Sequence, residues 1–120
     1  MSAEAQFRAL LAGYAAVVAM VDDRIALNAV PEGGGYPCIV YSVALATEAC
    51  LDPADDETHA TITVQCWAGS PTEARALADE VRAAVGAAPA ARCAWVMSEG
   101  TVFAEELGLD GVQLDVDWWP

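Results

Sequence analysis

The feature that most constrains this chain is a predicted strand that leads almost directly into a predicted helix. The segment His59–Trp67 (HATITVQCW) alternates apolar residues with polar ones, which is typical of a strand with one buried face. The next residues, Ser70–Glu73, form a capping box, in which a serine hydroxyl caps a backbone N–H and proline occupies the first helical position. Apolar residues then repeat at helical spacing over Ala74–Val85, and Gly86 stands where a left-handed terminating residue is expected. A strand and an amphipathic helix joined in this way indicate a sheet packed against helices.

Periodicity predicts the remaining elements as well. A second amphipathic helix is expected near the N-terminus, and three further strands surround the central unit. These elements are a helix over Ala3–Val21, a short extended segment at Arg24–Leu27, and strands at Cys38–Ala46, at Arg92–Ser98 (ended by Gly100) and at Val112–Trp119. The expected architecture is one α+β domain over residues 1–120, with one antiparallel sheet of about four strands packed against two helices in the order α-β-β-α-β-β.

Composition excludes several classes of function. The 120 residues carry a net charge of −13, with five arginines and no lysine. Proteins that bind nucleic acid broadly depend on basic side chains, so specific nucleic-acid binding is not expected. No apolar run reaches membrane-spanning length, and the N-terminus lacks the basic region of a secretory signal. We therefore expect no membrane partner.

The four cysteines, at positions 38, 50, 66 and 93, form no close pair, and only one histidine could join them as a ligand. Structural zinc sites require closely spaced ligands, so neither a metal nor any other cofactor is expected. Three of the cysteines fall in predicted strands, which favours buried free thiols in a reducing cytoplasm, with a disulfide as the alternative.

Three patterns could carry chemistry, and each has a simpler interpretation. The glycines at 33–35 could surround a phosphate, but no lysine or helix N-terminus follows them, which favours a turn or a subunit-contacting loop. The acidic stretch Asp52–Glu57 lacks the glycine of a calcium-binding loop. Asp115 and Asp117 share one face of the last predicted strand, about 7 Å apart, which favours a solvated or pore-facing acidic stripe over a catalytic pair. His59 has no catalytic partner nearby in the sequence.

The second face of the predicted sheet is polar but suited to burial by a neighbour. Thr63 and Gln65 lie on this face, and the aromatic residues Trp118 and Trp119 end the last strand. Four tryptophans are more apolar surface than a small monomer is expected to bury. We therefore expect the chain to form oligomers.

Several segments carry a family resemblance through their order and spacing. They are Asp23–Ile25 after the first helix, the Pro31–Pro37 loop, Ile39–Ser42, Val64–Ala68 and Thr72–Ala78, followed by the closing strand. This arrangement resembles the tail-completion, or tail-terminator, proteins of long-tailed bacteriophages and phage-like gene transfer particles. The resemblance covers nearly the whole chain.

The resemblance implies a structural protein rather than an enzyme. Proteins of this kind form a ring, usually a hexamer, that caps the head-proximal end of the tail tube, stops its polymerisation and joins it to head-completion or connector proteins. The implied location is the virion tail, after assembly in the host cytoplasm, and DNA passes through the ring without specific binding. Subunit contacts are then expected from Glu32, Gly34, Tyr36, Thr63, Gln65, Trp118 and Trp119, and channel-facing carboxylates from Asp55, Asp56, Asp115 and Asp117.

Two alternatives come from other classes of protein. The strong negative charge would also suit an inhibitor or immunity-type protein that covers a basic partner. A small-ligand enzyme using His59, Asp115 or Asp117 is the third interpretation. A stable homomeric ring would distinguish the first function from the second, and a concave pocket lined by these residues would favour the third.

Overall fold

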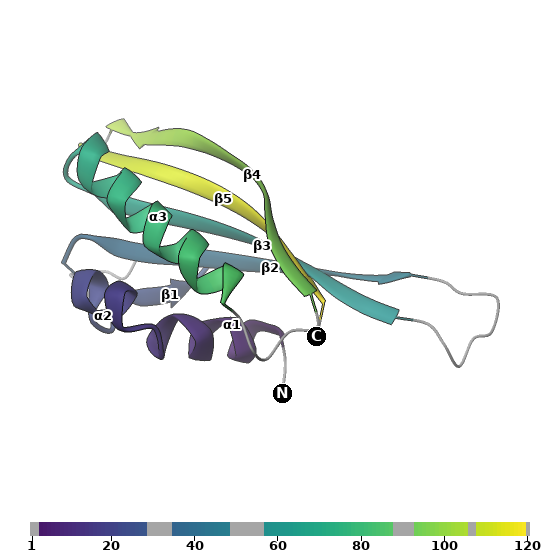
Figure 1. The fold of residues 1–120 in the computed structure, drawn as a ribbon. Coiled ribbons are helices and arrows are strands. Elements are labelled where there is room, and N and C mark those ends of the chain that lie inside the picture. The colour runs from purple at the N-terminus through teal and green to yellow at the C-terminus, as the bar shows by residue number, and fades with distance from the viewer. Residues whose placement is uncertain (1–2, 29–34, 49–56, 88–92, 106–107, 120) are drawn as a thin grey trace.

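The computed structural model describes residues 3–28, 35–48, 57–87, 93–105 and 108–119. Its centre is a five-stranded sheet with the strand order β1-β2-β3-β5-β4, and the helices cover one face of this sheet (Figure 1). The elements are α1 (Ala3–Ala12), α2 (Ala15–Val21), β1 (Ile25–Leu27), β2 (Cys38–Glu48), β3 (Glu57–Ala68), α3 (Pro71–Gly86), β4 (Cys93–Ala104) and β5 (Leu109–Trp119). The α+β class is as predicted, whereas the numbers of strands and helices are higher.

The sheet is mixed rather than purely antiparallel. The pairs β2/β3, β3/β5 and β5/β4 are antiparallel, but β1 lies parallel to β2 along one edge. The ladder continues on both sides of β1, where Ile39 N–H donates to the carbonyl of Arg24 and Asn28 N–H donates to that of Tyr41. The segment expected only to be extended at Arg24–Leu27 is thus a true edge strand. Its three residues are too few for alternation to reveal a strand.

The predicted N-terminal helix is broken into two at Gly13. The helices α1 and α2 meet at 86°, and Tyr14 between them has an extended backbone (φ −97°, ψ 109°). The bend lets both halves of the apolar stripe, from Phe7 to Val21, reach the same core. No single helix in the described ranges is long and apolar enough to cross a membrane, and α1 and α2 meet that test by length and composition only when taken together across the bend.

The central strand–helix unit is confirmed. The hydroxyl of Ser70 accepts a hydrogen bond from Glu73 N–H at 3.2 Å, and Pro71 begins α3. Ala74, Leu77, Ala78, Val81 and Val85 are buried, as helical spacing predicts. The expectation for Gly86 was wrong, because this residue is the last of the helix and Ala87 follows with φ −98°, donating its N–H to carbonyls of the final turn. A right-handed final turn needs no glycine.

The last two strands are longer than predicted, and β5 lies between β3 and β4. The predicted end of β4 at Gly100 was wrong, since Gly100 pairs with Gln113 and the strand continues to Ala104. A bulge between Val96 and Ser98 shifts the register of β4 against β5. Continuous pairing with β5 stabilises the extended backbone through the glycine, although glycine has a low preference for strands.

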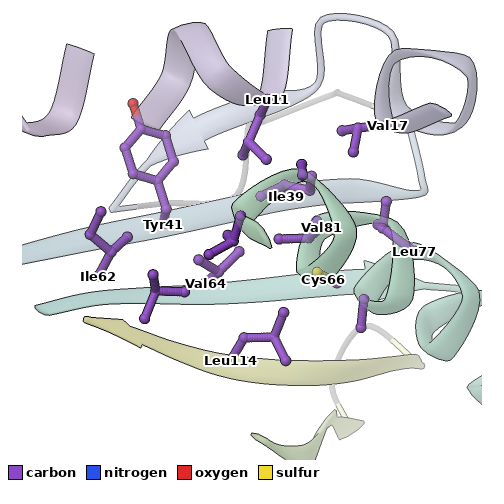
Figure 2. Packing of buried hydrophobic residues seen from close by; sticks show 14 of the residues in the cluster. Leu11, Val17, Ile39, Tyr41, Ile62, Val64, Cys66, Leu77, Val81 and Leu114 are labelled. Carbon is purple, nitrogen blue, oxygen red and sulfur yellow. The ribbon is translucent and has the colours of Figure 1, made fainter. Parts of the chain in front are cut away.

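The main core lies between the helices and the sheet. Figure 2 shows Leu11 and Val17 from the N-terminal helices and Leu77 and Val81 from α3 pointing toward Ile39, Val64 and other residues of the strands. The buried face of β3 and β5 consists of the alternating apolar positions that the sequence predicted. They are Ala60, Ile62, Val64 and Cys66 in β3, and Val112, Leu114, Val116 and Trp118 in β5.

Cys38 and Cys66 are buried free thiols, in agreement with the preferred interpretation of the sequence. Burial raises the pKa of the Cys66 thiol to about 12, with the nearby Cys38 adding to the effect. Burial also raises the pKa of Cys38, partly opposed by the positive charge of Arg24. Both groups are therefore protonated and unreactive at neutral pH. Cys50 lies outside the described residues.

Candidate interaction surface

The face of the sheet opposite the helices is the candidate site. In Figure 1 the described helices all lie on the other side of the strands, so none of them covers this face. We call it the open face. Its polar centre consists of Ser42, Thr61, Thr63, Gln65, Gln113, Asp115 and Asp117, which alternate along their strands with buried residues.

Hydrogen bonds across three strands hold the polar centre of the open face in place. Asp115 accepts from Thr63 Oγ1 on β3 at 3.2 Å and from Ser98 Oγ on β4 at 2.8 Å, one bond to each carboxylate oxygen. Gln65 Nε2 donates to Gln113 Oε1 at 3.2 Å, and the Oε1 atom of Gln65 accepts from Trp67 Nε1 at 3.3 Å. These bonds orient the side chains before any partner arrives.

The structure brings together residues that the sequence assigned to two different roles. Thr63 and Gln65 were expected in a subunit contact, whereas Asp115 and Asp117 were expected to face a channel. Thr63 pairs with Asp115 and Thr61 with Asp117 on neighbouring strands, so all of them lie on the same face. This face is one continuous surface that carries both pairs.

A hollow of about 210 Å³ opens on this face beside the end of β1. It forms because β1 ends at Leu27 while β2 continues to Glu48. The hollow is lined by Asn28, Val40, Tyr41, Ser42, Thr63 and Gln65. His59, Asp115 and Asp117 are not among these residues, so the structure provides no support for the enzyme interpretation at this position.

One end of the open face is apolar. Cys38, Val40, Trp67 and Leu109 form a second buried cluster there, with Val102 and Ala104 packed against it. Gly111 lies beneath the Trp67 ring, where a Cβ atom would be 2.8 Å from Trp67 and 2.8 Å from Val102. The indole of Trp67 therefore covers the sheet only because residue 111 has no side chain.

The described arginines all lie outside the strands. Of the five arginines, Arg8 lies in α1, Arg75 and Arg82 lie in α3, Arg24 precedes β1, and Arg92 is outside the described residues. The described strands therefore place no arginine on the open face. On the helix-covered side, Arg75 (2.8 Å) and Arg82 both bind the carboxylate of Glu99 on β4. Hydrogen bonds from Arg82 and Arg75 hold the pKa of Glu99 below its ordinary value.

The other predicted site residues lie in different environments, and several are outside the described residues. Trp118 was expected at a subunit contact, but its side chain is fully buried in the protomer and hydrogen-bonds to Gln6 through Nε1 at 3.1 Å, so that expectation was wrong. Tyr36 is exposed, as a contact residue must be. Trp119 ends β5, but its side chain is outside the described residues, as are Glu32, Gly34, Asp55 and Asp56. Among the described residues, no group of three or more His, Cys, Asp or Glu side chains could hold a metal ion.

Sequence reasoning identified Tyr36 but missed the other exposed apolar residues, which lie on the edge strands β1 and β4. The large apolar side chains that remain exposed in the described chain are Leu27, Tyr36, Trp95, Met97 and Phe103. A signal was present in β4, where the segment Ala94–Met97 is apolar at every position and so cannot alternate between a buried and a polar face. An edge strand of this kind is a candidate contact site.

The fold and this surface define an α+β protein with one covered and one open sheet face. Residues 5–119 match the family described as "Tail completion protein gp17", and the chain belongs to this family. As a member, it is a structural protein of the phage tail and not an enzyme.

A solved structure has the same fold. The chain matches a protein of the "Virion of native gene transfer agent (GTA) particle" with a TM-score of 0.72 and 18% sequence identity, covering 98% of this chain and 92% of that one. No curated protein matches.

Proposed function

We propose that this protein forms a ring that caps the head-proximal end of the tail tube, stops tube polymerisation and joins the tail to head-completion or connector proteins. Membership of the tail completion family supports this proposal, together with a protomer whose sheet is covered by helices on one face only. In the proposed ring the open face lines the channel through which DNA passes.

The electrostatics of the open face carry the channel assignment. Asp115 and Asp117 lie on this face, and the described strands place no arginine on it. The Debye length is about 8 Å at physiological salt, so DNA responds to charges on the channel wall rather than to those on the outer surface of a ring. Carboxylates at the wall repel phosphates, which keeps the genome from adhering as it passes.

Ring formation is tested by measuring solution mass and tube length. In light scattering, the purified protein, alone or with its tail tube protein, is expected to form a species several times the 12.5 kDa mass of the chain, with six copies as the expected number. In electron micrographs, adding the protein to polymerising tube protein is expected to shorten the tubes and to place density at one end only. A protein that is monomeric in both conditions and leaves tube length unchanged would contradict the proposal.

The channel assignment predicts an effect of charge reversal on DNA delivery. Particles carrying Asp115→Lys/Asp117→Lys are expected to release DNA several-fold more slowly, because ammonium groups at the wall bind phosphates, and added salt should reduce the delay. Ejection kinetics in vitro provide the measurement. The matched control is Asp79→Lys/Glu80→Lys, which changes the net charge equally but on α3. Equal kinetics in the two variants would place the channel elsewhere.

A further inference from the structure

The exposed apolar side chains lie at the two opposite edges of the sheet. Leu27 is 39% exposed on β1, while Met97 (47%) and Phe103 (62%) are exposed on β4, together with Trp95. The strand order makes β1 one edge and β4 the other. Tyr36 belongs to the first edge, since Arg24, directly before β1, donates a hydrogen bond through Nε to the Pro37 carbonyl at 2.9 Å. Trp95 pairs with Asp117, so it lies on the open face. We call the remaining two sets the β1 edge (Leu27, Tyr36) and the β4 edge (Met97, Phe103).

The β4 edge has few of the features that normally prevent a strand from pairing with another chain, and the one it has is the bulge between Val96 and Ser98. Exposed edge strands are usually short or carry outward charges or proline. β4 is 12 residues long and contains no proline, and Glu99 is its only charged residue. That carboxylate is bound by Arg75 and Arg82 on α3, so its charge is neutralised and does not oppose pairing with another strand. Beyond the bulge, from Ser98 to Ala104, β4 is therefore available for pairing with a partner.

The two edges also match in their positions along the strands. The ladders place Leu27 in one row across the sheet with Tyr41, Val64, Leu114 and Glu99. Met97 lies two residues along β4 from Glu99. They place Cys38 in one row with Val102, so Phe103 and Pro37 each lie one residue further in the same direction. If a second copy lay beside the first without a shift along the strand direction, Met97 of one copy would lie close to Leu27 of the other. Phe103 would likewise lie close to Tyr36.

We propose that the β4 edge of one protomer packs against the β1 edge of the next copy of this chain, with Met97 near Leu27 and Phe103 near Tyr36. The proposal rests on the ring proposed above, and it assigns that ring its subunit contact. Two different edges meet in a head-to-tail contact, which generates a closed ring when the rotation between copies closes. It also leaves the open face free to line the channel, which a contact through Thr63 and Gln65 would not.

Edge-blocked variants test this contact directly. Leu27→Glu blocks only the β1 edge and Met97→Glu blocks only the β4 edge, and both side chains are exposed, so the fold should persist, as circular dichroism can verify. Under conditions in which the wild type forms the ring, each variant alone is expected to stay monomeric by light scattering. An equimolar mixture is expected to stop at dimers, because the intact β4 edge of Leu27→Glu can still contact the intact β1 edge of Met97→Glu.

The control variant is Ala76→Glu, which adds the same charge at an exposed position of α3 and should assemble like the wild type. Rings formed by Leu27→Glu or Met97→Glu would overturn the edge contact while leaving the ring itself intact. Monomeric variants whose mixture gives no dimer would also overturn it. A wild type that never assembles would refute both the ring and its contact, which separates failure of the proposed function from failure of this inference.

Discussion

Trp118→Ala is expected to lower the free energy of unfolding by about 3–5 kcal/mol, as is typical when a large aromatic side chain is removed from a core. Trp118 is the largest of the fully buried side chains in the described part of the chain. Its ring packs edge-on against that of Phe7, with the ring centroids 5.8 Å apart. Because domains of this size are stable by only about 5–15 kcal/mol, this loss is a substantial share of the total. Urea denaturation followed by circular dichroism measures the loss.

Two related variants define what Trp118 contributes. Trp118→Phe keeps most of the packing against Phe7 but loses the hydrogen bond to Gln6, so it should cost only about 1–2 kcal/mol. Trp95→Ala makes the same truncation at a tryptophan that is 44% exposed on the neighbouring strand, and it should cost less than about 1 kcal/mol. Equal losses for Trp118→Ala and Trp95→Ala would contradict the placement of Trp118 in the core.

Gly111→Ala is expected to destabilise the protein by about 1–2 kcal/mol. Alanine in place of glycine usually stabilises by about 0.4–1 kcal/mol because it restricts the unfolded chain. At this position the new Cβ would lie 2.8 Å from both Trp67 and Val102, and overpacking of this kind costs about 1–3 kcal/mol. Steric overlap should therefore outweigh the gain in the unfolded state. Chemical denaturation, with tryptophan fluorescence to detect displacement of Trp67, measures both effects.

Gly100 provides the matched control, because it pairs with Gln113 on the neighbouring strand and a Cβ built there meets nothing within 4 Å. Gly100→Ala should be neutral or stabilising by up to about 1 kcal/mol. If both alanine variants were stabilising, the close approach of Trp67 to residue 111 would not exist in solution.

Local patterns predicted the local structure well. The alternation in β3 and β5 and the periodicity of α3 correctly identified the buried positions, because burial on one face is a property of neighbouring residues. The same alternation already placed Trp118 with the buried residues Leu114 and Val116. The error lay in treating the aromatic end of the chain as a surface feature, although the strand period assigned Trp118 to the core.

Features that depend on distant residues could not be predicted in this way. Nothing in the sequence near β5 indicates that this strand lies between β3 and β4, so the hydrogen bonds of Asp115 to Thr63 and Ser98 were not foreseen. The break at Gly13 has a similar origin, because tertiary packing of both halves on one core outweighs the continuous helical pattern. The edges of the sheet follow from strand order, so the exposed apolar residues of β1 and β4 were not identified from the sequence.

The position of β5 also has a consequence for biosynthesis. β4 emerges from the ribosome before β5, but its only neighbour in the sheet is β5, which follows it in the chain. A nascent chain that has completed β4 therefore has no strand to pair it with, and the sheet is completed only when β5 has been translated. Ribosome-bound or prematurely terminated chains that end before β5 thus lack the strand that holds β4 in the sheet.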